Sequence, residues 1–78
     1  MARPEKAGHL AKRSLTLAGH RTSIALEPAF WAALEEAAAA RRISLAALVA
    51  EVDAAREPHL PLASALRVFA LAAGRSGS

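Results

Sequence analysis

The sequence predicts a mainly α-helical domain with one short β-strand, and three patterns lead to this fold class. Residues 21–26 alternate small or polar side chains with bulkier ones, the period of a strand with one exposed and one buried face. Two later runs, residues 27–41 and 45–56, repeat apolar residues three and four positions apart, as on one face of a helix. Because one strand and short helices bury little apolar area, we expect the chain to pair with a second copy.

Length and composition limit the chain to one small domain. Its 78 residues divide into a flexible basic arm (1–13), a folded domain (14–73) and a disordered tail (74–78). There is no cysteine, so neither disulfides nor a thiolate metal site stabilise the domain. No apolar run approaches the roughly 18 residues of a membrane span, and the charged start lacks the apolar part of a secretory signal. We therefore expect a cytoplasmic protein without a membrane partner.

The net charge of +3 is distributed unevenly. Residues 1–21 contain five basic residues and one acidic residue, whereas residues 22–78 contain five basic and six acidic residues. Such asymmetry is typical of a polyanionic partner, usually a nucleic acid or a membrane surface. A solubilising tail has the same composition, so both interpretations stay open for Lys12 and Arg13.

Start and stop signals define the helices. Pro28 suits a first helical position because the N–H that proline lacks would be unpaired there. Ser44 is a good N-cap for the second helix. Residues 57–61 (EPHLP) break the pattern, and a third helix is expected over residues 62–73 with Gly74 as its C-cap.

The segment before the main strand is ambiguous. Residues 14–17 alternate only weakly, and this favours either a short extra strand or an extended arm. Gly19 allows a bend between this segment and the main strand.

The residues of the strand and the first two helices resemble a known family. Residues 21–34 (RTSIALEPAFWAAL) and 42–49 (RISLAALV) resemble the ribbon-helix-helix transcription factors, the Arc and MetJ class. Residues 14–26, with the later run 62–69, are similar to a bacterial subfamily of short members that has an added arm and a third helix. The resemblance covers about residues 14–72.

This resemblance implies an intertwined homodimer that binds double-stranded DNA, either as one dimer or as a dimer of dimers. In the family, one strand from each chain pairs into an antiparallel ribbon, and the ribbon enters the major groove. By position, the outward, base-contacting residues would be Arg21, Ser23 and Ala25. The phosphate contacts would come from the N-terminus of the second helix and from the basic arm, at Ser44, Leu45, Ala46, Lys12 and Arg13.

The apolar residues of the same elements would form the dimer core. Aromatic residues can also stack on bases, but Phe30 and Trp31 share helical spacing with Leu34, which favours core packing. The expected core residues are Ile24, Leu26, Phe30, Trp31, Leu34, Leu48, Val49 and Val52.

Two departures from the family pattern support an alternative, a protein-interaction module of antitoxin or adaptor type that does not bind DNA. Only Arg21 is a long side chain on the expected ribbon face, and residues 14–20 can pair with or cover that face. The third helix either caps the core or binds a protein partner through Leu62, Leu66 and Phe69.

Catalytic and metal-binding patterns are absent from the sequence. His9, His20 and His59 lie far apart, and no serine has a histidine and an acid at a recognisable spacing. We therefore expect no enzyme activity, no metal and no cofactor, and we predict a DNA-binding transcriptional regulator with salt-dependent affinity.

Overall fold

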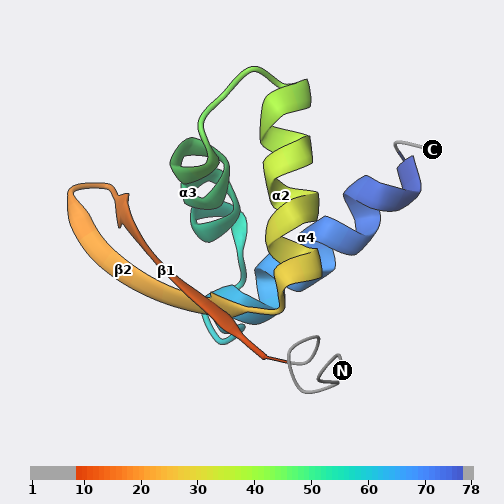
Figure 1. Cartoon of the computed structure of the whole chain (residues 1–78). Coiled ribbons are helices and arrows are strands. Elements are labelled where there is room, and N and C mark those ends of the chain that lie inside the picture. Colours follow the sequence, from red (N-terminus) through yellow and green to blue (C-terminus); the bar gives the residue numbers. More distant parts are fainter. Residues whose placement is uncertain (1–8, 77–78) are drawn as a thin grey trace.

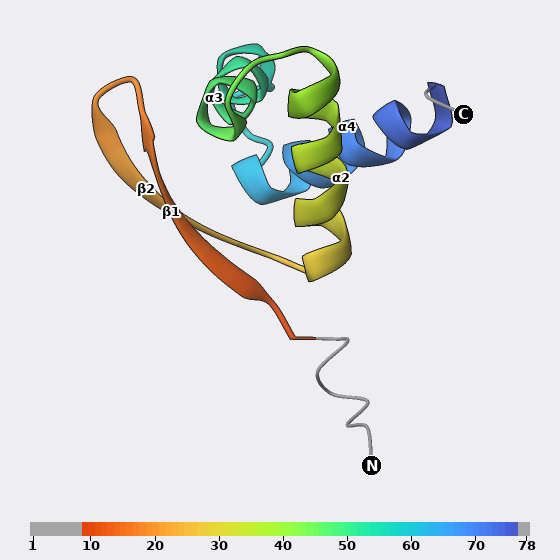
Figure 2. The ribbon, with the colours of Figure 1, turned by 45° about the horizontal axis from the view of Figure 1, so that its top comes forward.

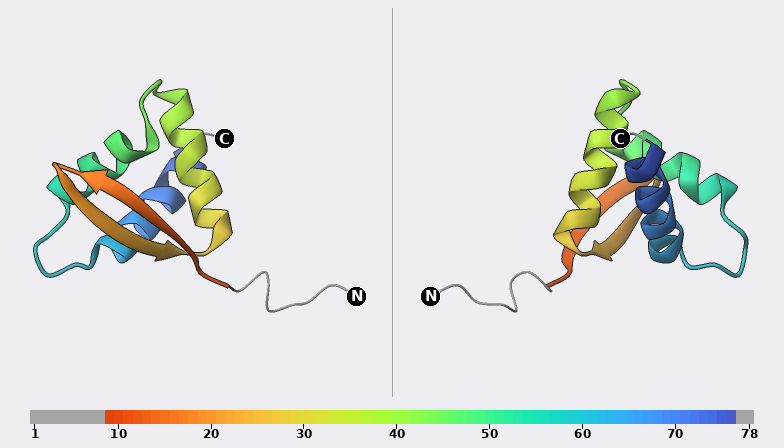
Figure 3. Two further views of the ribbon diagram at one scale, coloured as in Figure 1. Left: turned by 60° about the vertical axis from the view of Figure 1, so that its left-hand side comes forward. Right: turned by 90° about the vertical axis from the view of Figure 1, so that its right-hand side faces the viewer.

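The computed structural model describes residues 9–76, which form a two-stranded ribbon followed by three helices (Figure 1). The elements in chain order are β1 (Ala11–Leu17), β2 (His20–Leu26), α2 (Pro28–Ala40), α3 (Leu45–Ala55) and α4 (Leu62–Ser76). The twisted ribbon lies along one side of the helices (Figure 2). Figures 1 and 2 show that the C-terminal part of α4 runs away from the ribbon, and in the right-hand view of Figure 3 this end of α4 lies in front, with the ribbon behind it.

The expectation of a single strand is wrong, because the segment before β2 forms a second strand. β1 and β2 pair antiparallel in a register that runs from Ala11 opposite Leu26 to Leu17 opposite His20. Ala18 and Gly19 connect them with φ angles of 51° and 85°. A two-residue loop with positive φ at both positions is a type I′ turn, whose twist matches that of a hairpin. Both strands of the ribbon therefore belong to one chain.

The strand and helix ends differ from the expected ends by more than one residue at two places. β1 begins at Ala11, so it includes residues 11–13, which sequence analysis placed in the arm. α4 continues to Ser76, so Gly74 lies inside the helix and is not its C-cap. Of the rest of the expected arm and tail, residues 9 and 10 are exposed and belong to no strand or helix, and residues 1–8 and 77–78 lie outside the described residues.

The predicted helix starts are confirmed. Pro28 occupies the first turn of α2. The Ser44 side chain accepts a hydrogen bond from the backbone N–H of Ala47 at 3.0 Å, as expected of an N-cap. Between the two helices, Arg42 adopts φ 58°, and the N–H of Ile43 donates to the carbonyl of Ala38 at 3.0 Å. This bond satisfies one of the carbonyls left free at the end of α2.

One hydrophobic core lies between the ribbon and the helices. Its buried residues come from both strands and all three helices: Leu17, Ile24, Leu26, Trp31, Leu34, Ala38, Leu48, Val49, Ala65, Leu66 and Ala70. Of the eight residues expected in a dimer core, Phe30 and Val52 are half-buried, and the other six are buried within this single chain. β1 and α4 pack against apolar side chains that β2, α2 and α3 alone would leave exposed.

Polar contacts attach β1 to α2. The indole Nε1 of Trp31 donates a hydrogen bond to the carbonyl oxygen of Ala11 at 2.7 Å. The Arg13 guanidinium lies 4.9 Å from the centre of the Trp31 ring and forms an ion pair with Glu35. A cation over an indole face is attracted by its electron density, so Arg13 and Trp31 together hold the strand on the helix.

A second arginine attaches α4 to the start of α2. The Nε of Arg67 donates to Oε1 of Glu27 at 2.9 Å, and its guanidinium lies 5.8 Å from the centre of the Phe30 ring. The hydrogen bond from Arg67 stabilises the charged carboxylate and so lowers the pKa of Glu27 below its ordinary value.

Candidate nucleic-acid interface

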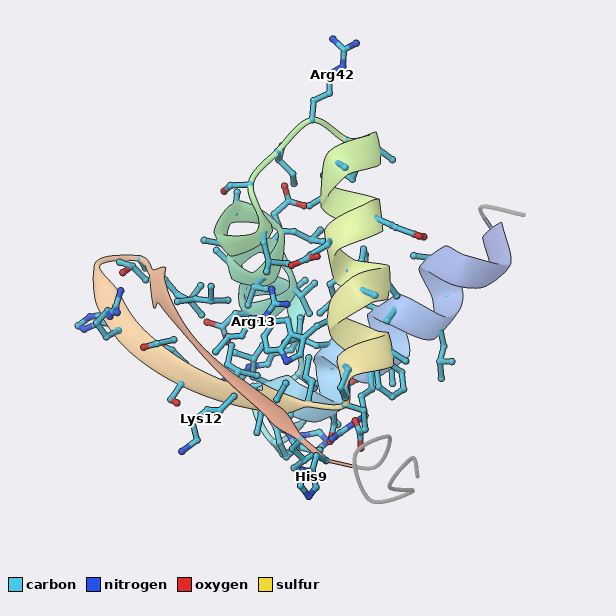
Figure 4. The ribbon with its side chains drawn as sticks, in the orientation of Figure 1. His9, Lys12, Arg13 and Arg42 are labelled. Carbon is cyan, nitrogen blue, oxygen red and sulfur yellow. The ribbon has the colours of Figure 1, made fainter. Side chains whose placement is uncertain are left out.

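The outward face of the ribbon brings six side chains together in three cross-strand pairs. The register places Lys12 opposite Ala25, Ser14 opposite Ser23, and Thr16 opposite Arg21. Ala25 is half-buried, and the other five are exposed. Figure 4 shows Lys12 pointing away from the helices. Because successive residues of a strand point to opposite faces, the core residues Ile24 and Leu26 lie on the reverse side.

This face is cationic and polar. The whole segment 6–26 contains no acidic residue, so no fixed negative charge from the ribbon opposes an approaching polyanion. Lys12 lies opposite Ala25, which is four residues from Arg21 along β2. Four residues correspond to about 13 Å along the ribbon at roughly 3.3 Å per residue. The major groove of DNA, roughly 12 Å wide, admits a two-stranded ribbon of this kind.

Arg21 is directed by its cross-strand neighbour. Its Nη1 donates to Oγ1 of Thr16 at 3.3 Å, and this bond leaves the other guanidinium donors free to bind a ligand. Guanidinium groups recognise guanine by two parallel hydrogen bonds, and hydroxyl groups both donate to and accept from base edges. The arrangement can therefore contact the edges of several neighbouring base pairs.

The two basic residues that sequence analysis assigned together to a phosphate-binding arm lie on opposite faces of β1. Lys12 points outward, whereas Arg13 points toward the helices, where it contacts Trp31 and Glu35 (Figure 4). Arg13 therefore makes its contacts within the chain, and Lys12 is the cation that β1 exposes on the outward face.

The three residues expected at the second phosphate site surround the N-terminus of α3. Ser44 is exposed and caps the helix, and Leu45 and Ala46 are half-buried behind it. The first N–H groups of a helix have no partner within the helix, and its dipole makes this end attractive to anions. Nearby, Arg42 extends into solvent from the α2–α3 turn (Figure 4), and Arg41 forms an ion pair with Glu51 at 2.9 Å.

The side chains proposed for a protein partner lie in or against the core. Leu66 is fully buried, and Leu62 and Phe69 are packed against the core. The exposed large apolar residues of α4 are instead Val68 and Leu71, which are 61% and 58% exposed. Beside Val68 runs an open apolar groove of about 400 Å³ between α3 and α4, lined by Val52, Ala55, Arg56, Glu57, Leu60, Ala65, Val68 and Phe69.

The described part of the chain contains no group of three or more histidine, cysteine, aspartate or glutamate side chains able to hold a metal ion. Within residues 9–76, no helix combines the length and apolar character needed to cross a membrane.

Sequence reasoning missed Ser14 and Thr16 as members of the outward face. The alternation of residues 12–17 (KRSLTL) and the glycine at position 19 were the available signals. These signals were weak for two reasons. Arg13 interrupts the series of apolar residues on the inner face of the strand. Ala18 precedes Gly19 at a turn position where asparagine is more usual.

Comparison with known proteins identifies the family. The family model of the ribbon-helix-helix domain matches residues 10–73, which include both strands and most of α4. Searches of curated proteins and of solved structures found no significant match. The family in general consists of DNA-binding regulators that form dimers and are typically not enzymes. The match confirms the resemblance seen in the sequence, and the chain belongs to the ribbon-helix-helix family.

Proposed function

We propose that this protein is a cytoplasmic, homodimeric transcriptional regulator that inserts its ribbon into the major groove of DNA. The observation that carries the proposal is the outward face of the ribbon, where Lys12, Arg21 and three hydroxyl side chains gather without any acidic residue. Membership of a family of DNA-binding proteins supports it.

In this proposal, Arg21 contributes most to base recognition. Its guanidinium forms two hydrogen bonds with a guanine, Ser23 makes one hydrogen bond to a base edge, and Ala25 contacts a thymine methyl group. Lys12 at the other end of the face contacts a phosphate, as do the N–H groups at the start of α3, near Ser44. Because each phosphate contact releases counterions, the affinity falls steeply as salt rises.

The exposed apolar residues of α4 support the homodimer. Val68 and Leu71 lie on the same face of the helix, next to the groove between α3 and α4. A second copy that covers this surface removes it from water and adds to a core that is small for a domain of this size. The dimer then joins two ribbons, each complete within its own chain, in place of one ribbon shared between two chains.

The dimer is tested by sedimentation equilibrium of the full chain. We expect a dimer for the unmodified protein and a shift toward monomer for Val68→Asp, because the charge would be buried without a partner. An unmodified chain that stays monomeric at high concentration would refute the homodimer. The same apolar surface favours a second candidate function, a protein-interaction module that does not bind DNA, and so does the pairing of β1 with β2, which sequence analysis counted in favour of this alternative. This function follows if the chain neither dimerises nor binds DNA selectively.

DNA binding is tested by fluorescence anisotropy of labelled genomic fragments across a salt series, with Arg21→Ala alongside. We expect fragment-selective binding that Arg21→Ala loses while its circular dichroism spectrum stays unchanged. Arg42→Ala removes the same charge from an exposed turn, so it should weaken all fragments alike and keep the preference. Weak, fragment-independent binding that vanishes with salt would contradict sequence reading by the ribbon.

A further inference from the structure

We infer that β1 flanks the DNA-contacting surface and binds phosphates, because two copies of the chain join through the outer edges of their β2 strands. The joined sheet then has the strand order β1-β2-β2-β1, with one β2 strand from each chain at its centre. This inference rests on the proposed function, and it gives β1 a role that base recognition by β2 does not require.

β2 has an open edge. Within the described residues the sheet contains only two strands, so each strand pairs with a neighbour on one side alone. A two-residue turn makes Leu17 and His20 a hydrogen-bonded pair, and such pairs alternate along an antiparallel ribbon. Every second residue from His20 therefore directs its backbone groups to β1. The residues between them, Arg21, Ser23 and Ala25, direct theirs to the opposite side.

A second copy of the chain fits this edge. Within residues 9–76, no hydrogen bond outside the ribbon engages the backbone of Arg21, Ser23 or Ala25. Unpaired N–H and C=O groups along a strand edge are a template for another strand. The β2 strand of a second copy has the same length. In an antiparallel pair centred on Ser23, Arg21 lies opposite Ala25 of the other chain, so every open group is paired and no like charges meet.

The edge of β1 is open in the same way, but α3 lies on that side of the ribbon. Near the turn, β1 lies between β2 and α3 (Figures 1 and 2), and α3 packs against β1. A second copy that approached β1 would meet this helix, whereas no helix lies beyond β2 there. The exposed residues of α4 lie elsewhere, so the edge contact adds to the one proposed through Val68 and Leu71.

The dimensions of the joined sheet place β1 beside the phosphates. Neighbouring strands lie about 4.8 Å apart, so the two β2 strands fit inside a major groove that is roughly 12 Å wide. The two β1 strands are three such spacings apart, about 14 Å, and therefore lie over the walls of the groove. The sugar–phosphate backbones form these walls. The exposed side chains of Lys12 and Ser14 then donate hydrogen bonds to phosphate oxygens.

Single cysteines test the joined edge, because the chain contains no cysteine of its own. In the joined sheet, residue 23 lies opposite its own copy with Cα atoms about 5.5 Å apart, which suits a disulfide. The two copies of residue 14 are about 14 Å apart, too far for a disulfide. At micromolar concentration we expect Ser23→Cys to crosslink on mild oxidation at least roughly tenfold faster than Ser14→Cys.

Ser14→Cys is the matched control, since Ser14 lies directly opposite Ser23 on the same exposed face. Equal or faster crosslinking of Ser14→Cys would overturn the inference, because the copies would then not join through β2. Slow crosslinking of both variants would overturn it too, if sedimentation equilibrium shows that the unmodified chain is a dimer. An unmodified chain that stays monomeric would instead refute the proposed homodimer.

The phosphate contacts are tested by fluorescence anisotropy with a preferred and a non-preferred DNA fragment across a salt series. We expect Ser14→Ala to weaken binding to both fragments by the same factor, roughly threefold, and Lys12→Gln to reduce the salt dependence of both. Ser23→Ala makes the same change on the neighbouring strand, and it should lower the ratio of the two affinities. Circular dichroism confirms that the variants fold.

The paired serine variants separate phosphate contact from base contact by β1. A loss of fragment preference in Ser14→Ala equal to that in Ser23→Ala would overturn the inference, because β1 would then contact bases. Unchanged binding by both Lys12→Gln and Ser14→Ala would overturn it as well. An unmodified chain that prefers no fragment would refute the proposed function, whatever the cysteine variants show.

Discussion

Replacing Arg13 with glutamine should loosen β1 from the helices without changing the outward face of the ribbon. In the folded chain, the Arg13 guanidinium contacts the Trp31 ring and pairs with Glu35 of α2. Glutamine keeps most of the aliphatic stem but removes the charge from both contacts. The hydrogen bond from Trp31 to the carbonyl of Ala11 does not involve the Arg13 side chain and should persist.

The expected loss follows from the exposure of the partners. The side chains of Arg13 and Glu35 are 40% and 50% exposed, so their ion pair contributes only about 0.2–1 kcal/mol. A cation over an aromatic ring at such an exposed site adds about 0.5–1 kcal/mol. We therefore expect Arg13→Gln to lower the free energy of unfolding by about 1 kcal/mol. For a domain of this length, that corresponds to about 4–8 °C in Tm.

Urea unfolding followed by tryptophan fluorescence measures this loss. Trp31 is the only tryptophan and the chain contains no tyrosine, so the signal reports directly on the helix that contacts β1. Both proteins must be compared at the same concentration, because the proposed dimerisation would make apparent stability depend on it. Lys12→Gln is the matched control, since it removes the same charge from the neighbouring outward position and should cost less than about 0.5 kcal/mol.

Two results would refute the reasoning. Equal losses in the free energy of unfolding for Arg13→Gln and Lys12→Gln would mean that stability depends only on the net charge of β1. No loss for Arg13→Gln would mean that the contacts with Trp31 and Glu35 are energetically neutral in solution.

Three further predictions concern the turn, the third helix and acid stability. Gly19→Ala should lower the free energy of unfolding by about 1 kcal/mol in urea titrations; the new Cβ meets no atom within 4 Å, so the cost comes only from the φ of +85°. Leu66→Ala should cost about 2–5 kcal/mol because the side chain is fully buried; a loss below about 1 kcal/mol would show that α4 is not part of the core. The depressed pKa of Glu27, caused first by its hydrogen bond from Arg67, contributes stability that is complete above its ordinary value of 4.5 and is lost as the pH falls through the lower folded value. Urea midpoints measured from about pH 6 down to about pH 3 should therefore fall less for Glu27→Gln than for the unmodified chain, and equal slopes would contradict this assignment.

The elements with strong local signals were predictable from the sequence. The alternation of residues 21–26 defined β2 and its outward residues, and Pro28 and Ser44 marked the starts of α2 and α3. Each of these signals depends on neighbours in the chain, so it can be interpreted without knowing the tertiary structure.

β1 was harder to predict because its inner face carries a cation. Arg13 occupies a position where the alternation requires an apolar residue. Its contacts, Trp31 and Glu35, come from a helix about twenty residues further along the chain, and only the folded structure brings them together. The outward position of Ser14 and Thr16 depends on the strand register, which the sequence pattern left undetermined.

The closure of the ribbon by Ala18 and Gly19 has a consequence for assembly at low concentration. A strand tethered by two residues meets its partner at an effective concentration that does not change when the protein is diluted. Hairpins of this kind form within about 1–10 μs, long before two chains meet at micromolar concentration. A ribbon shared between two chains would be lost whenever the chains separate. The β1–β2 ribbon of this protein needs no second chain to close, so under the proposed homodimer it would persist when the two copies separate.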